Sequence, residues 1–148
     1  MLYESFHTQI STHIYLSVEK FKLHIKTTCP IFTIMNQLKV RTVFFYKTYF
    51  SDFYAKQRLK VRDKILWTFR IVEYVQHVPK IYLEHLEDTD GLYEIRVKQG
   101  SDIFRIFCFF DEDQLVVLAN GYQKKTQRTP KAEIEKALRI KKQYEQEK

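Results

Sequence analysis

The amino-acid sequence predicts a single α+β domain, in which a helical hairpin precedes a small antiparallel sheet and one more helix follows it. Apolar residues recur at helical spacing from Val61 onward, and the period changes to two from Leu92 onward. Near the end, Thr129 and Pro130 precede a charged, amphipathic segment. With 148 residues, 45% of them hydrophobic, the chain is long enough for one hydrophobic core and too short for two.

The first half of this domain is expected to hold one strand and the helical hairpin. Residues 39–46 are rich in side chains that favour strands. The hairpin is predicted to begin near Ser51 or Asp52, because either side chain can cap a helix. Its second helix is predicted by an apolar stripe that ends before Pro79. The stripe consists of Val61, Ile65, Phe69, Val72 and Val75.

The strand predicted at Leu92–Lys98 has one buried face and one polar face. Its apolar residues alternate with Glu94, Arg96 and Lys98, which therefore point to the same side. The sequence Q-G-S-D at 99–102 predicts a turn that returns the chain antiparallel. The sequence thus places two cations together on one face of the sheet.

Two more strands and a helix complete the predicted domain. The runs 103–110 and 115–119 are apolar on both faces except for Arg105, which is typical of central strands. Thr129 is predicted to be the N-cap of the final helix with Pro130 at its first position. The residues predicted for the inner face of that helix are Ile134, Leu138 and Tyr144.

Composition limits the classes of function. The chain has 25 Lys and Arg against 18 Asp and Glu, a formal net charge of +7, which favours polyanions or acidic proteins as partners. Two distant cysteines, Cys29 and Cys108, indicate a reduced compartment. No apolar run is long enough for a transmembrane helix and no secretory signal is evident, so we expect a cytoplasmic protein. Three glycines exclude the glycine-rich loops of a P-loop or dinucleotide-binding fold.

Residues 1–34 differ in character from the rest of the chain. They hold few charges and three histidines, His7, His13 and His24. The spacing of these histidines matches no compact zinc-ligand pattern, so we do not predict a metal site. Two interpretations stay open: Met35 is the true start of a domain at 35–148, or residues 1–34 form an extension, such as one added helix.

Three motifs follow one another in the last third of the chain: G-L-Y-E-I-R-V at 91–97, F-R-I-F at 104–107 and G-Y-Q-K-K-T-Q-R-T-P at 121–130. In this order, with a terminal helix, they resemble the toxins of the RelE superfamily, in particular its HigB-like, phage-derived branch. The resemblance covers residues 35–148. It implies the RelE-like fold and the toxin of a type II toxin–antitoxin system, an endoribonuclease that cleaves messenger RNA on the ribosome. It also implies no cofactor and an antitoxin partner, acidic or of the helix-turn-helix type.

The resemblance implies roles for individual residues. The cations at matching positions are expected to bind the codon phosphates and to stabilise the transition state. Candidate catalytic residues are Arg96, Lys98, Arg105, His85 in the loop before Gly91, and Tyr122; candidate RNA-binding residues are Lys124, Lys125 and Arg128. His85 is preferred to His77, which lies near the end of a predicted helix.

Cations suffice for such a reaction because the nucleophile comes with the substrate. The ribose 2′-hydroxyl attacks the neighbouring phosphate, and the protein has to orient it and to neutralise a dianionic phosphorane. An arginine can hold two phosphoryl oxygens at once, and a lysine supplies a point charge. No metal ion is required by this chemistry.

Several alternatives remain at the level of sequence. Arg96 and Lys98 can belong to an ordinary solvated face, and Glu94 is more readily explained as a salt-bridge partner than as a general base. Arg105 needs a partner or an opening, because an unpaired buried charge is costly. The whole protein can instead be a ParE-like poison of DNA gyrase that cuts no RNA, or an inactive RNA- or antitoxin-binding protein. Convergence of Arg96, Lys98 and Arg105 on one face distinguishes the ribonuclease, since a gyrase poison does not need it.

Overall fold

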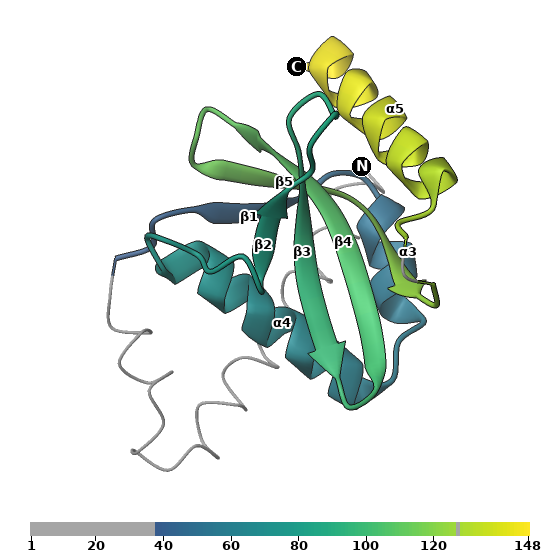
Figure 1. The fold of residues 1–148 in the computed structure, drawn as a ribbon. Coiled ribbons are helices and arrows are strands. Elements are labelled where there is room, and N and C mark those ends of the chain that lie inside the picture. Colours follow the sequence, from purple (N-terminus) through teal and green to yellow (C-terminus); the bar gives the residue numbers. More distant parts are fainter. Residues whose placement is uncertain (1–37, 127) are drawn as a thin grey trace, which may run out of the picture. The chain divides into compact units, whose positions relative to one another are not determined.

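A computed structural model describes residues 38–126 and 128–148 of the protein. The described chain forms five strands and three helices (Figure 1). In chain order these are β1 (Thr42–Phe45), α3 (Tyr49–Ala55), α4 (Leu59–Tyr74), β2 (Leu83–His85), β3 (Leu92–Gln99), β4 (Asp102–Asp111), β5 (Leu115–Lys124) and α5 (Lys131–Glu147). The interpretations of residues 1–34, including the added helix and the histidines, lie outside the described residues.

The α+β class is confirmed. The strands form one sheet in the order β1-β5-β4-β3-β2, and β3, β4 and β5 pair antiparallel as predicted. The sheet is larger than the sequence indicated and is mixed. β1 pairs parallel to β5 at one edge, and the three-residue strand β2 pairs antiparallel to β3 at the other.

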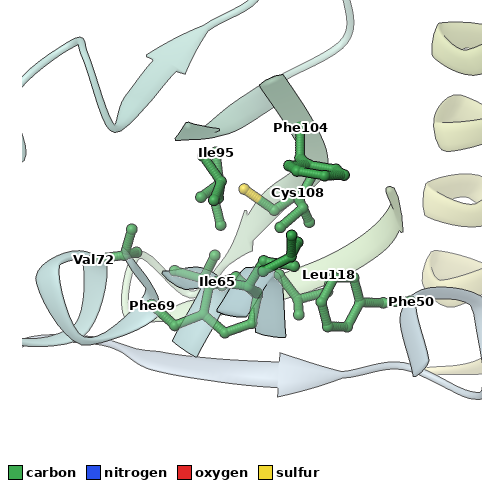
Figure 2. Packing of buried hydrophobic residues seen from close by; sticks show 12 residues of the cluster. Phe50, Ile65, Phe69, Val72, Ile95, Phe104, Cys108 and Leu118 are labelled. Atoms are coloured by element: carbon green, nitrogen blue, oxygen red, sulfur yellow. The ribbon is translucent and has the colours of Figure 1, made fainter. Parts of the chain in front are cut away.

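One face of the sheet packs against α3 and α4; it is called the α4 face below (Figure 1). Four residues of the predicted stripe, Val61, Ile65, Phe69 and Val72, are buried against the strands, and Figure 2 shows this packing around Ile95 and Cys108. Each fully buried side chain of this size stabilises the fold by about 1.5–3 kcal/mol. Val75 follows the last helical residue as the C-cap.

The opposite face packs against α5 and is called the α5 face. Its apolar part is formed by Leu92, Phe107, Phe109, Val117 and Ala119, which pack with Ala137 and Ile140 of the helix. The predicted inner residues Ile134, Leu138 and Tyr144 pack around this cluster, half-buried. Hydrogen bonds fix the end of the helix: Tyr46 donates to Glu147 at 2.7 Å and Tyr144 donates to Asp111 at 2.7 Å.

Two predicted helix starts were wrong by a few residues. α5 begins at Lys131. Its N-cap is Pro130 rather than Thr129, because the backbone of Pro130 is still extended. α3 begins at Tyr49 after Thr48, before the predicted Ser51 or Asp52. In neither case does a side chain make the capping hydrogen bond on which the prediction depended.

The β4–β5 ladder is irregular between Ile106 and Cys108, where the register shifts. Gly121 lies at this place on the α4 face, and a Cβ atom there would come within 2.5 Å of the Phe53 ring. A glycine therefore allows α3 to approach the sheet closely. No helix within residues 38–126 and 128–148 is long and apolar enough to cross a membrane.

Candidate functional site

The register of the three central strands assembles the predicted cations. Arg96 of β3 lies directly opposite Arg105 of β4, and Arg105 lies opposite Tyr122 of β5. Residues directly opposite each other in a ladder point to the same face of the sheet. These three side chains therefore form one row across the α5 face, beyond its apolar part.

A second row runs beside the first. Lys98 lies opposite Ile103, and Ile103 lies opposite Lys124. Both lysines are two residues from a member of the first row, so they share its face. We call the five polar residues of the two rows the basic patch: Arg96, Lys98, Arg105, Tyr122 and Lys124.

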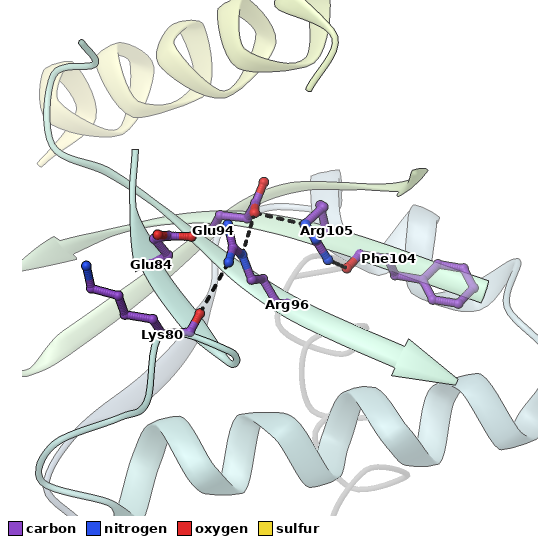
Figure 3. Close-up of polar contacts among 6 residues, drawn as sticks. All are labelled: Lys80, Glu84, Glu94, Arg96, Phe104 and Arg105. Carbon is purple, nitrogen blue, oxygen red and sulfur yellow. Dashed lines mark hydrogen bonds and ion pairs between the residues drawn. The ribbon is translucent and has the colours of Figure 1, made fainter. Parts of the chain in front are cut away.

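A buried carboxylate lies at the edge of the basic patch, in contact with both of its arginines (Figure 3). The Oε1 atom of Glu94 is 2.9 Å from the Nε atom of Arg96 and 2.8 Å from the Nε atom of Arg105. Arg96 also pairs with Glu84 of β2, and its Nη1 atom donates to the carbonyl of Lys80 at 3.5 Å. The salt-bridge role that the sequence favoured for Glu94 is confirmed.

The two arginines differ in burial and in their contacts. The Arg105 side chain is 12% exposed and that of Arg96 is 32% exposed. The second contact of Arg105 among the described residues is from Nη1 to the carbonyl of Phe104 at 3.2 Å. Arg96 is thus held by two carboxylates and a carbonyl, whereas Arg105 keeps most of its five N–H donors for a ligand.

Buried polar atoms without a hydrogen-bond partner concentrate at the basic patch. Among the described residues they are Glu94 Oε2, Arg105 Nε, Asn120 Oδ1 and Tyr122 Oη. Arg105 Nε touches Glu94, but its N–H is not aligned with the oxygen, so this contact is a charge interaction rather than a hydrogen bond. Buried polar groups are rarely left unpaired. Of these, the Tyr122 hydroxyl is the donor that a bound phosphate can pair with, since Glu94 Oε2 and Asn120 Oδ1 are acceptors and Arg105 Nε faces Glu94.

Tyr122 joins the basic patch to the start of α5. Its ring stacks on Phe107 with centroids 5.6 Å apart. Burial raises the pKa of the Tyr122 phenol, the nearby Thr129 hydroxyl opposes the rise, and the charges of Glu94 and Arg105 also act on it. Because its pKa is raised, the Tyr122 phenol stays protonated at neutral pH and is suited to donate a proton rather than to accept one. A second link between β5 and α5 lies nearby: Asn120 donates from Nδ2 to Glu133 at 2.8 Å.

Three predicted site residues lie apart from the two rows. His85 is the last residue of β2 rather than part of a loop. It lies opposite Tyr93, with ring centroids 5.0 Å apart, and Tyr93 packs with the α4-face cluster. His85 therefore points away from the basic patch. Lys125 and Arg128 are exposed in the segment between β5 and α5.

Two residues near the basic patch were missed at the level of sequence. Glu84 was missed because a three-residue strand carries almost no periodic signal, so its pairing with β3 could not be anticipated. Asn120 has a visible signal, since it is the one polar residue in the run L-V-V-L-A-N. A polar side chain in a buried strand usually has a specific partner.

The arrangement offers fixed positive charge and a protonated phenol on one face of a rigid sheet. A polyanion such as a nucleic-acid backbone can bind there through its phosphates. Within residues 38–126 and 128–148 there is no group of three or more His, Cys, Asp or Glu side chains placed to hold a metal ion.

Comparison with models of protein families gives a match. The family model described as "Phage derived protein Gp49-like" matches residues 52–142, from within α3 to within α5. No curated protein matches the chain significantly. The matched region contains every residue of the basic patch together with Glu84 and Glu94, and the match is compatible with a toxin of a toxin–antitoxin pair.

Proposed function

The chain belongs to the family of phage-derived Gp49-like proteins, and from that premise we propose that it is the toxin of a type II toxin–antitoxin pair, a RelE-like and HigB-like endoribonuclease that cleaves messenger RNA on the ribosome. The observation that carries the proposal is the basic patch. Arg96, Lys98 and Arg105 lie on one face of the sheet. Cleavage of RNA requires this convergence of cations, whereas the poisoning of gyrase does not.

The proposed reaction is an attack by the ribose 2′-oxygen on the adjacent phosphorus. The bond from phosphorus to the 2′-oxygen forms while the bond from phosphorus to the 5′-oxygen breaks. The 2′-hydroxyl loses its proton to water and the 5′-oxygen gains one, which leaves a cyclic phosphate and a free 5′-hydroxyl. Negative charge grows on the phosphoryl oxygens in the transition state. Preorganised donors at these oxygens lower the barrier, and each is worth on the order of 10²–10³ in rate.

Arg105 is the proposed ligand of the phosphoryl oxygens. It lies at the centre of the row between Arg96 and Tyr122. Its low exposure reduces screening by water, which strengthens its interaction with a bound phosphate. Lys98 and Lys124 flank it from the second row and would bind neighbouring phosphates of the codon.

Tyr122 is the proposed proton donor to the departing 5′-oxygen. Its raised pKa keeps the phenol protonated, and its hydroxyl is one of the unpaired buried atoms of the patch. Its ring is also placed to stack on a base. Lys125 and Arg128 would extend RNA binding along the exposed segment before α5.

The partners follow from the same face. Ribosome-bound messenger RNA would be the substrate, and an antitoxin would inhibit the protein by covering the basic patch, which an acidic surface can do. We further propose that the protein acts in the cytoplasm, where translating ribosomes are found.

Induced expression followed by mapping of RNA 5′ ends tests the proposal. We expect new 5′ ends inside translated messages, and none when the Arg105→Ala variant is expressed at the same level. Intact messages together with inhibited gyrase would instead support a ParE-like poison. Intact messages with active gyrase and retained RNA binding would identify an inactive binding protein.

A further inference from the structure

Glu94 has an unusual position for an acidic residue. It is buried, with 2% of its side chain exposed, yet it lies on the polar side of β3 between two arginines. A carboxylate in such a position is retained only where cations compensate its desolvation. Here both cations meet the same oxygen atom, Oε1, through their Nε atoms.

The register explains why a carboxylate is needed there. Arg96 and Arg105 lie directly opposite each other across β3 and β4, and like charges in that relation repel. Glu94 contacts both and offsets the repulsion. Without it, the two guanidinium groups would be expected to move apart into solvent.

Because both contacts use the Nε atoms, the terminal nitrogens of the guanidinium groups are left for other partners. Those of Arg96 meet Glu84 and the Lys80 carbonyl. Those of Arg105 have one contact among the described residues, to the Phe104 carbonyl. Glu94 therefore fixes the direction of the Arg105 side chain while leaving donors exposed to a ligand.

Glu94 is too enclosed to take a proton from the substrate itself. Its Oε2 atom is buried, and Oε1 is occupied by both arginines. A general base has to come within hydrogen-bond reach of the proton that it accepts. Any effect of Glu94 on cleavage would therefore act through the arginines.

We propose that Glu94 is a positioning residue, which holds Arg96 and Arg105 side by side so that Arg105 meets the phosphoryl oxygens in a fixed orientation. The inference rests on the proposed function for its catalytic consequence, but the ordering of the two arginines is independent of it. Misplacing a catalytic group by about 1 Å costs on the order of 100-fold in rate.

The test uses the full-length protein and the Glu94→Gln variant, which keeps the shape of the side chain and removes its charge. Side-chain NMR of the arginine Nε–H groups measures orientation directly. We expect ordered Arg96 and Arg105 signals in the wild-type protein and mobile ones in the variant. Single-turnover cleavage on programmed ribosomes should fall about 100-fold at saturating ribosome concentration, with the ribosome concentration for half-maximal rate unchanged.

Glu73→Gln is the matched control. Glu73 is also a buried glutamate, but it pairs with Lys39 and with the backbone of β1, away from the basic patch. We expect Glu73→Gln to lower stability without changing arginine order or the cleavage rate. If Glu94→Gln does not fold, Glu94→Asp shortens the same carboxylate by one methylene and should still release at least one arginine.

The outcomes are separable. Arginines that stay ordered in Glu94→Gln would overturn the inference, as would mobile arginines with an unchanged cleavage rate. A wild-type protein that cleaves no message would refute the proposed function, and the NMR comparison would still decide whether Glu94 orients the arginines.

Discussion

At the scale of single residues, the two arginines of the basic patch are not equivalent. Sequence alternation allows Arg96 to be an ordinary solvated residue, whereas Arg105, within an apolar strand, needs a partner or an opening. The structure pairs Arg96 with Glu84 and Glu94 and leaves Arg105 less exposed, with fewer partners. A cation that is already paired with two carboxylates attracts a phosphate less strongly than a cation that shares one carboxylate with a neighbouring arginine.

We therefore expect Arg105→Ala to lower the cleavage rate about 10²- to 10³-fold, and Arg96→Ala and Lys98→Ala to lower it less. Cleavage of a defined message on purified ribosomes measures the effect. Arg139→Ala is the control, since Arg139 is exposed on α5. Equal activity of a folded Arg105→Ala protein would remove Arg105 from the site.

Lys124 and Lys125 are adjacent in sequence but differ in position. Lys124 ends β5 on the face of Arg105, whereas Lys125 follows the strand and is exposed. We expect the double Gln variant to bind programmed ribosomes more weakly, with a flatter dependence on salt, because fewer counterions are released. Lys124→Gln alone should account for most of the change. An unchanged salt slope would show that both lysines are merely solvated.

At the scale of elements, α5 is held at its C-terminal end by carboxylates. Hydrogen bonds from Lys47 and Tyr46 lower the pKa of Glu147 from 4.5 to about 2. Hydrogen bonds from Lys148 and Tyr144 lower the pKa of Asp111. Groups with a lowered pKa in the folded state stabilise it above their ordinary pKa, and this stabilisation is lost as pH falls through the folded value.

We therefore expect Glu147→Gln to melt at a lower temperature than the wild-type protein at neutral pH, with the difference disappearing as pH falls from 4.5 to about 2. Thermal melts at a series of pH values measure this. Glu135→Gln, at an exposed position of the same helix, should show no such convergence. A constant difference at all pH values would mean that Glu147 acts through packing rather than through charge.

The contact between α3 and β5 depends on the absence of a side chain at Gly121. A Cβ atom would lie 2.5 Å from Phe53, so we expect Gly121→Ala to lower the free energy of unfolding by about 1–3 kcal/mol. Phe53→Leu should recover part of the loss in the double variant. Gly100→Ala provides the contrast, because Gly100 has φ +63° but open space around it, and Phe53→Leu should not rescue it. Chemical denaturation of the wild-type protein, the three single variants and the two double variants measures these effects.

At the scale of the whole molecule, both faces of the sheet are covered by helices that follow Met35 in sequence. We therefore expect a protein beginning at Met35 to fold and to keep its toxicity. Solubility, a cooperative melt and growth inhibition on induction measure this. If that protein were insoluble while the full chain folds, residues 1–34 would contribute to the core.

The sequence by itself determined the class of the fold, the order of its main elements and the side to which most strand residues point. It did so because periods of 3.6 and two are local properties of the chain. The pattern placed Arg96 and Lys98 on one face and identified Arg105 as a cation that needs a partner. The three motifs suggested a phage-derived branch of toxins, and the model of a phage-derived family matches residues 52–142.

Only the tertiary structure decided which strands pair and in which register. Parallel pairing of β1 with β5 joins segments that are far apart in sequence, and the addition of β2 beside β3 involves a strand too short to show a periodic pattern. The register between β3 and β4 sets Arg96 opposite Arg105, within reach of one Glu94 oxygen, and the register of β2 turns His85 away from them. A register depends on how several faces are buried at once, so no local pattern could have revealed that a single carboxylate holds both arginines.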